Sequence, residues 1–326
     1  SQCGKKREEK LPDNIAVKSI ADLPAQVSAS PKSAAESRAR YFNTGNAFNV
    51  QLPPVPNMVF MDEPRKALSD ASPTGLIPCD VSHLMQCPFP ATSPLVLAYY
   101  GRILGDAELK TDFVASGAVY YVIKGKGVTV SGDERIEWNT GDVFVTPGDT
   151  CQIHKAIDEP AVLWIVTNEP QLAFEHLQAP RAGGAPTDVV HYPSDEIDRQ
   201  IDLIYKVGRG DDIAGSALIF SSSKQEDSRN VLPTLTVAMN SLPAGITQRP
   251  HRHNSVAISL VIQGENCFSM IDGERKDWAP WATTITPPVS VHSHHNAGNE
   301  QAKFLIVQDG GIYYHARAMG FEFIDD

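Results

Sequence analysis

The feature that most limits how this chain can fold is an internal repeat of a β-rich segment. Residues 118–125 (AVYYVIKG) align with residues 257–264 (AISLVIQG), and Thr146-Pro147 aligns with Thr286-Pro287. Each copy also carries a hairpin signal, at Gly132-Asp133 and at Asp272-Gly273. Two similar units of short strands and turns predict two small antiparallel barrels in one chain.

Composition divides the rest of the chain around the two copies. The four expected parts are an N-terminal arm with a short helix (1–75), the first barrel (90–175), a linker with a short helix (176–230) and the second barrel (231–326). The arm is rich in proline and weak in periodicity, with a helix expected at 31–41. In the linker, apolar spacing over 194–207 predicts another helix. The predicted fold class is therefore all-β, with two jelly-roll barrels, an arm and short helices.

Charge and cysteine content limit the partners and the compartment. The net charge is −11 and the pI is about 5.4, which argues against binding to nucleic acid or to an anionic membrane. No apolar run is as long as a membrane span. The five cysteines form no C-x-x-C pair and are odd in number, which predicts reduced thiols and a cytoplasmic protein. The alternative is a lipoprotein anchored through Cys3 after signal cleavage, and a trimmed start is the simpler explanation of Ser1.

A cluster of histidines gives the second copy its candidate chemistry. His251 and His253 form an H-x-H pair, and alternate residues of a strand point to the same face. The two imidazoles are therefore close enough to share a metal. His292, after the next strand, is the candidate third ligand of a facial set. The bland alternative is that these are surface or hydrogen-bonding histidines in a barrel without metal.

The neighbours of these histidines suggest a pocket. His294 has the strand parity of His292, so it is expected to line the pocket as a hydrogen-bond donor or a base, whereas His295 is expected to point away. Ala257 and Ser259 share the parity of His253, and their small size would leave space for a ligand. Asn296 and Tyr313 complete the candidates for the substrate pocket. For Asn296 the alternative is a strand-end residue that ties a loop, and for Tyr313 a core or subunit contact.

The first copy lacks this histidine set. In the alignment of the two copies, His251 falls on Asp112, His253 on Val114 and His292 on Gln152, while His294 falls on His154. The first barrel is therefore expected to be structural, or to serve as an interface for the other barrel.

The spacing of these residues resembles the two-part cupin signature, G-x5-H-x-H-x3/4-E-x6-G followed by P-x-G-x2-H-x3-N. The matching residues are Gly245, His251, His253, Gly264, Pro287, His292 and Asn296. Two positions depart from it: Ala257 or Ile258 falls where the signature has glutamate, and Val289 falls where it has glycine. The resemblance implies a bicupin whose metal is held by three histidines without a carboxylate, which favours a chelating anionic substrate.

Among bicupins, the second half most resembles the gentisate 1,2-dioxygenase group, which includes salicylate and 1-hydroxy-2-naphthoate dioxygenases. That group has H-R-H-x3-A-x-R and W-H-x-H-x-N, and this chain has HRHNSVAIS from His251 and VHSHHN from Val291. The resemblance implies Fe(II) on His251, His253 and His292, with His294 beside it. It implies an oxidoreductase of aromatic compound catabolism, an extradiol-type dioxygenase that uses O2 to cleave an acidic, phenolic or enolic substrate. It also implies a homo-oligomer.

Two departures from the group keep other functions open. The group's substrate-binding arginine falls at Ser259, and its metal usually lies in the first barrel. One alternative is a non-oxidative cupin, a lyase, isomerase or hydrolase in which Mn, Ni or Zn polarises a carbonyl of a small polar acid. The other is a non-catalytic ligand-binding bicupin. Oxygen consumption distinguishes the dioxygenase from these two alternatives.

Overall fold

The structure is a computed structural model that describes residues 17–207 and 216–325. The chain divides into two units, Ser1–Pro53 and Pro54–Asp326. Cys3, the candidate lipid anchor, lies outside the described residues. In the first unit, η1 (Ile20–Asp22) is followed by β1 (Gln26–Val27), α1 (Ala34–Arg38) and β2 (Arg40–Tyr41). The helix is shorter than the expected 31–41, because its N-cap is Ser33, whose Oγ accepts a hydrogen bond from the Glu36 amide at 3.1 Å.

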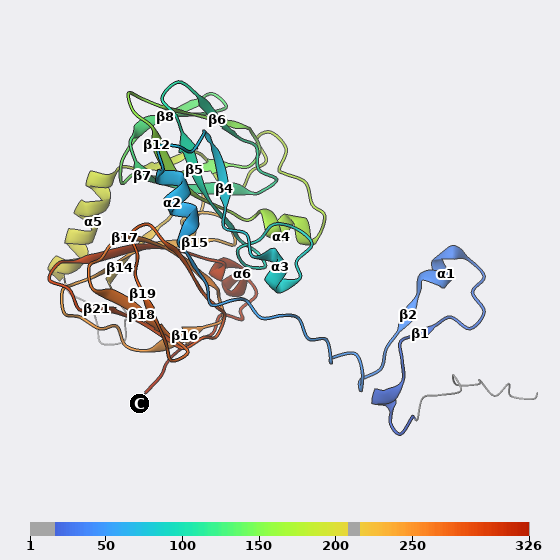
Figure 1. The fold of residues 1–326 in the computed structure, drawn as a ribbon. Helices are drawn as coiled ribbons and strands as arrows, with labels where there is room; N and C mark the ends of the chain where they lie inside the picture. Colours follow the sequence, from blue (N-terminus) through green and yellow to red (C-terminus); the bar gives the residue numbers. More distant parts are fainter. Residues whose placement is uncertain (1–16, 208–215, 326) are drawn as a thin grey trace, which may run out of the picture. The chain divides into compact units, whose positions relative to one another are not determined.

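In the second unit, the first barrel is a jelly roll made of two antiparallel sheets (Figure 1). The six-stranded sheet has the order β13-β10-β7-β12-β5-β4, and the four-stranded sheet has the order β6-β11-β8-β9. The strands are β4 (Gly75–Pro78), β5 (Leu97–Ile103), β6 (Glu108–Thr111), β7 (Gly117–Lys124), β8 (Lys126–Ser131), β9 (Glu134–Asn139), β10 (Val143–Pro147), β11 (Gln152–Ala156), β12 (Ala161–Thr167) and β13 (Val190–Tyr192).

The second barrel repeats this arrangement. Its six-stranded sheet has the order β14-β15-β22-β17-β20-β3, and its smaller sheet has the order β19-β18-β21-β16-β23. The strands are β3 (Val59–Phe60), β14 (Ser216–Phe220), β15 (Thr236–Leu242), β16 (His251–His253), β17 (Ala257–Gln263), β18 (Cys267–Ile271), β19 (Glu274–Asp277), β20 (Thr283–Thr286), β21 (His292–Asn296), β22 (Ala302–Gln308) and β23 (Phe321–Phe323). Both predicted hairpins are confirmed, since each turn signal joins two paired strands. The all-β jelly-roll prediction is therefore confirmed.

Short helices accompany the sheets. They are α2 (Asp62–Leu68), α3 (Ser82–Met85), α4 (Glu169–Phe174), α5 (Ser194–Val207) and α6 (Gly310–His315). The predicted helix over 194–207 is confirmed as α5, which buries Ile197 and Ile201 on one face as its apolar spacing requires. Helix α2 was not expected, because it follows a proline-rich stretch and contains Pro64 in its first turn, where proline is tolerated.

The segments expected as arm and linker supply four strands to the barrels. β3 comes from the expected arm, β4 begins at the arm's last residue, Gly75, and β13 and β14 come from the expected linker. All four are the outermost strands of the two large sheets. Edge strands tolerate residues that cannot complete a ladder of hydrogen bonds, which suits β4, which ends in Pro78, and β13, which precedes Pro193. The segment from Pro54 to residue 75 thus lies in the same unit as the barrels.

The two barrels share one hydrophobic core between their six-stranded sheets. Outward residues of both sheets, such as Val119, Trp164, Ile258 and Leu305, belong to a single buried cluster. Thr283 of the second barrel accepts a hydrogen bond from Trp164 Nε1 at 2.9 Å, and its hydroxyl lies 2.7 Å from the Tyr100 hydroxyl. The two barrels are therefore joined by packing and by buried hydrogen bonds.

Candidate metal centre

Three histidines meet on the inner face of the second barrel's smaller sheet. His251 and His253 lie on β16, His292 lies on β21, and the register places His251 opposite His292. One nitrogen of each ring can be chosen so that all three lie within 4.8 Å of one another. All three side chains are buried, which keeps this group of nitrogens away from bulk water.

The backbone fixes the tautomer of each of these rings. Nδ1 lies 2.9 Å from a backbone carbonyl oxygen in all three, that of Arg249 for His251, Ser255 for His253 and Ser290 for His292. A carbonyl can only accept, so Nδ1 carries the hydrogen and Nε2 keeps a free lone pair. This is the arrangement by which proteins orient metal-binding histidines. The three lone pairs fit one metal ion.

Burial also keeps these rings neutral. It lowers the pKa of His251 and of His253, and it lowers the pKa of His292 to about 2, with neighbouring histidines adding to the effect. A neutral imidazole is the form that binds a metal, so this set is ready for a metal at neutral pH. Within the described residues, no Asp or Glu belongs to the set, so the protein ligands would leave the charge of a divalent ion uncompensated.

His294 lies beside the set but does not belong to it. Its ring is buried between Phe304, at a centroid distance of 4.6 Å, and His292, at 5.9 Å. Burial lowers the pKa of His294 to about 3. His295 lies on the other face of β21, where it stacks on Phe268 at 4.5 Å and contacts the hydroxyls of Ser293 and Thr247.

The candidate pocket residues lie in different surroundings. Ala257 packs with Phe304 inside the barrel, and Ser259 is buried two residues further along β17. Asn296 donates from Nδ2 to the carbonyls of Leu242 and Glu300 and accepts from the Gly298 amide. These bonds suit the loop-tying alternative. Tyr313 lies half-buried on α6. As substrate contacts, all four stay predictions.

The strand register corrects the alignment of the two copies. Thr111 pairs with Gln152 in the first barrel, as His251 pairs with His292 in the second. The residue at the place of His251 is therefore Thr111, not Asp112, and Phe113 rather than Val114 follows at the place of His253. The error arose because the first copy has one more residue between this strand and the aligned segment at 118–125, which an ungapped alignment misses. The first barrel lacks the metal set in either alignment.

The interiors of the two barrels differ in how they are filled. In the first barrel, Tyr120 and Phe144 are register partners, stack at a centroid distance of 4.4 Å, and fill the space between the sheets. The corresponding partners in the second barrel are Ser259 and Thr284. Small side chains therefore stand in the second barrel where the first has an aromatic pair.

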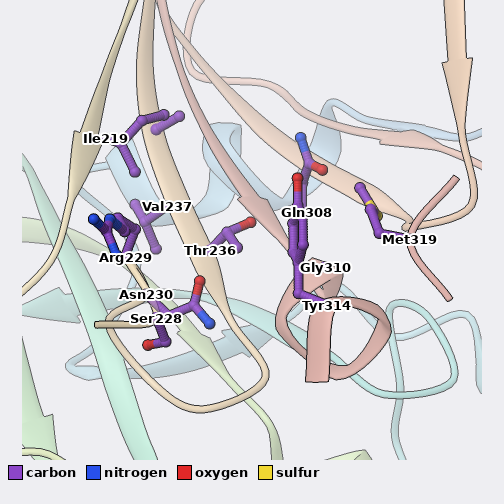
Figure 2. A pocket seen from close by; sticks show the side chains of 11 residues that line it. Ile219, Ser228, Arg229, Asn230, Thr236, Val237, Gln308, Gly310, Tyr314 and Met319 are labelled. Carbon is purple, nitrogen blue, oxygen red and sulfur yellow. The ribbon is translucent and has the colours of Figure 1, made fainter. Parts of the chain in front are cut away.

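A cavity of about 490 Å³ lies beside β15 and β22 of the second barrel (Figure 2). Its lining includes Thr236 and Ala238 of β15, Gln308 of β22, Arg229 and Tyr314. Gln308 Oε1 accepts a hydrogen bond from Ser255 Oγ at 2.8 Å. The carbonyl oxygen of Ser255 in turn lies 2.9 Å from His253 Nδ1. The cavity is thus linked to His253, one of the candidate metal ligands, through Gln308 and Ser255. Sequence reasoning missed Arg229 and Gln308, whose positions carry no local signal.

Comparison with known proteins covers part of the sequence. Residues 239–308 match the family model "Cupin domain". A gentisate 1,2-dioxygenase of Ralstonia sp is 31% identical over 68 residues, which is 21% of this chain and 19% of that protein. A 5-aminosalicylate 1,2-dioxygenase of Comamonas sp is 37% identical over 71 residues, again 19% of its length. The matched segment thus spans about a fifth of the length of these relatives.

Comparison of structures covers most of the chain. A salicylate 1,2-dioxygenase from Pseudaminobacter salicylatoxidans superposes with a TM-score of 0.70 over 82% of this chain and 88% of that one, at 15% identity. An oxalate decarboxylase from Bacillus subtilis gives a TM-score of 0.50 at 16% identity. The superpositions show that the three chains share a common fold.

Proposed function

We propose that this chain, a two-barrel cupin protein resembling the gentisate dioxygenases, is a metal-dependent dioxygenase that cleaves a hydroxylated aromatic or enolic acid. The observation that carries the proposal is the set of three buried imidazoles that each offer one nitrogen within 4.8 Å of the others, with Nδ1 facing a backbone carbonyl and no carboxylate in the set. Imidazole suits iron, zinc and nickel alike. Bound Fe(II) would supply the reaction with O2 that no side chain in the barrel provides.

The charge of the site favours an acidic substrate. Three neutral ligands leave the positive charge of the ion in a buried place, where a chelating anion is the natural counter-charge. The related enzymes are named for gentisate, 5-aminosalicylate and 1-hydroxy-2-naphthoate. Each of these acids carries a hydroxyl next to a carboxylate, so it offers two adjacent oxygen donors. We propose the same class of acid here.

Small side chains inside the second barrel support binding of a ring. Ser259 and Thr284 are much smaller than Tyr120 and Phe144, which hold the equivalent places in the first barrel, and we propose that the ring binds there. The adjoining cavity is of a size typical for small ligands. Arg229 is the charged residue of its lining, and we propose that it attracts the substrate carboxylate in place of the arginine missing at Ser259.

The test begins with the metal content of freshly purified protein. The protein is then loaded with Fe(II) without air, and oxygen uptake is recorded with gentisate, salicylate and 1-hydroxy-2-naphthoate. Uptake that depends on both iron and acid supports the proposal. Bound metal without any uptake contradicts it and favours the non-oxidative alternative, which the absence of an arginine at Ser259 leaves open.

Three variants make the test specific. His292→Ala is expected to abolish metal binding and oxygen uptake, because one of three ligands is lost. His295→Ala, on the opposite face of the same strand, is the matched control. It is expected to keep metal binding and oxygen uptake. Ser259→Tyr introduces the side chain of the first barrel, and it is expected to keep the metal but block the substrate. Substrate turnover by Ser259→Tyr at the wild-type rate would contradict the proposed position of the ring.

A further inference from the structure

A chain of hydrogen bonds runs behind His294. Trp278 Nε1 donates to Ser269 Oγ at 2.9 Å, and Ser269 Oγ lies 2.7 Å from His294 Nδ1. Trp278 also packs on Phe304 at a centroid distance of 5.0 Å, and Phe304 packs on the His294 ring. The ring is therefore held from one side by hydrogen bonds and from another by aromatic contacts.

Counting hydrogens along this chain fixes the tautomer of His294. The indole nitrogen can only donate, so Ser269 Oγ accepts from Trp278. Among the described residues, the remaining partner of Ser269 Oγ is His294 Nδ1, so the hydroxyl hydrogen is directed to that nitrogen. His294 Nδ1 is then the acceptor, and in a neutral ring the hydrogen lies on Nε2. The three metal-binding histidines have the opposite tautomer, because their Nδ1 atoms face carbonyls.

The first barrel contains the same chain of hydrogen bonds. Trp138 Nε1 donates to Thr129 Oγ1 at 2.9 Å, and Thr129 Oγ1 lies 2.7 Å from His154 Nδ1. There the other nitrogen, Nε2, meets Thr111 Oγ1 at 2.9 Å. Thr111 stands at the place of His251, so in the first barrel a hydroxyl oxygen occupies the space next to Nε2. In the second barrel, Nε2 has no hydrogen-bond partner among the described residues.

We propose that Trp278 and Ser269 are positioning residues that hold His294 with its hydrogen on Nε2, so that it donates a hydrogen bond to an oxygen of the bound acid. In this state His294 has no lone pair on Nε2, which is why a fourth histidine beside the set does not become a metal ligand. It acts as a donor to the substrate, and it does not remove the substrate's proton. The tautomer follows from this chain's hydrogen bonds alone, whereas the contact with an acid rests on the proposed function.

The tautomer is measured first, in the full chain without metal. Long-range ¹H–¹⁵N NMR spectra of the histidine rings distinguish a hydrogen on Nδ1 from one on Nε2. We expect His294 and His154 to carry it on Nε2, and His251, His253 and His292 to carry it on Nδ1. A hydrogen on Nδ1 of His294 would overturn the proposal whatever the protein's activity.

Variants of Ser269 then test the positioning role. Ser269→Ala removes the hydroxyl, and the NMR signal of His294 is expected to change to a mixture of tautomers. Ser269→Thr keeps the hydroxyl, as Thr129 does in the first barrel, and is expected to keep the Nε2 tautomer. Trp278→Phe removes the indole donor and is expected to weaken the preference. An unchanged His294 tautomer in Ser269→Ala, with far-UV and near-UV circular dichroism spectra intact, would contradict the role of the hydroxyl.

The last measurement separates this inference from the proposed function. With Fe(II)-loaded protein and gentisate, Ser269→Ala is expected to raise KM about tenfold at an unchanged metal content, as loss of one oriented hydrogen bond predicts. Ser269→Thr is expected to restore KM to near the wild-type value. No turnover by the wild type with any acid would contradict the proposed function, yet the NMR result would still decide the tautomer. Turnover with an unchanged KM in Ser269→Ala would contradict the donor role.

Discussion

Val289 has a backbone conformation that β-branched residues rarely adopt. Its φ is 59°, its amide donates to the carbonyl of His253 at 2.8 Å, and its side chain is 60% exposed. The cupin signature has glycine at this position, and the positive φ explains that preference. In this chain the turn forms with valine instead. A left-handed conformation costs a residue with a Cβ atom about 1–2 kcal/mol.

Val289→Gly is therefore expected to stabilise the protein. The released strain exceeds the conformational entropy of glycine in the unfolded chain, so we expect the free energy of unfolding to rise by about 0.5–1 kcal/mol. Urea unfolding measures it. Val130→Gly, at a valine of strand β8 that is 38% exposed, is the control and is expected to lower the free energy of unfolding. A loss of stability in Val289→Gly would contradict the strain.

His154 makes the stability of the protein depend on pH without any metal. Burial lowers its pKa to about 3, and both ring nitrogens contact threonine hydroxyls. The unfolded chain, with a histidine pKa of about 6.5, binds more protons between these values, so stability is lost as pH falls below about 6.5. From pH 7 to pH 5 this one group costs about 2 kcal/mol.

The matching measurement is urea unfolding at several pH values for the wild type and His154→Gln. The variant is expected to be less stable at pH 7, but to lose about 2 kcal/mol less than the wild type between pH 7 and pH 5. Other buried histidines contribute equally to both proteins, so the difference between the two pH profiles isolates His154. Parallel profiles would show that His154 is protonated equally in the folded and unfolded states.

At this scale, strand parity was enough to place the histidines. Alternation put His292 and His294 on one face and His295 on the other, as the structure has them. Strand parity does not predict the tautomer of each histidine, because the tautomer depends on whether a carbonyl or a hydroxyl faces Nδ1. The hydrogen-bond chain of Trp278 and Ser269 has a counterpart in the repeat, since Trp138 and Thr129 hold equivalent places in the first copy.

At the scale of elements, the edge strands show what local patterns omit. β3 consists of only Val59–Phe60, and it pairs with Thr283 and Thr284 of β20. The strands of the first barrel lie between β3 and β20 along the chain. Two residues between prolines carry no periodicity, so a strand was not expected there. The pairing exists because Phe60 is buried in the core that the barrels share. Tertiary packing therefore decides this element.

Phe60→Ala tests that explanation. Removing a buried aromatic ring is expected to lower the free energy of unfolding by about 3 kcal/mol or more. Phe174→Ala is the matched control, because Phe174 is 71% exposed on α4, and it is expected to change stability by less than about 0.5 kcal/mol. Denaturant unfolding measures both variants. A small effect of Phe60→Ala would show that β3 is dispensable.

At the scale of the whole molecule, the repeat predicts two barrels, but it does not predict that they pack against each other through one hydrophobic core. An internal repeat reveals similar units, and it says nothing of which faces they turn to each other. The apolar residues on both faces of β7 and β12 were the available sign, since a strand buried on both faces needs a second partner. In the described residues, no helix is both long and apolar enough for a membrane span.

A substitution at Thr283 can test whether the two barrels unfold together. Its hydroxyl accepts from Trp164 of the first barrel and contacts the hydroxyl of Tyr100, and Thr283 is fully buried. Thr283→Val keeps the shape but leaves the Trp164 indole N–H without its acceptor, at a cost of about 1–3 kcal/mol. Because one core joins the barrels, we expect this loss to destabilise both barrels equally, in a single unfolding transition. Tryptophan fluorescence, which includes Trp164, and far-UV circular dichroism should then give the same midpoint in urea, shifted together in the variant. Two separated midpoints would show instead that each barrel folds as an independent domain and that the shared core contributes little to cooperativity.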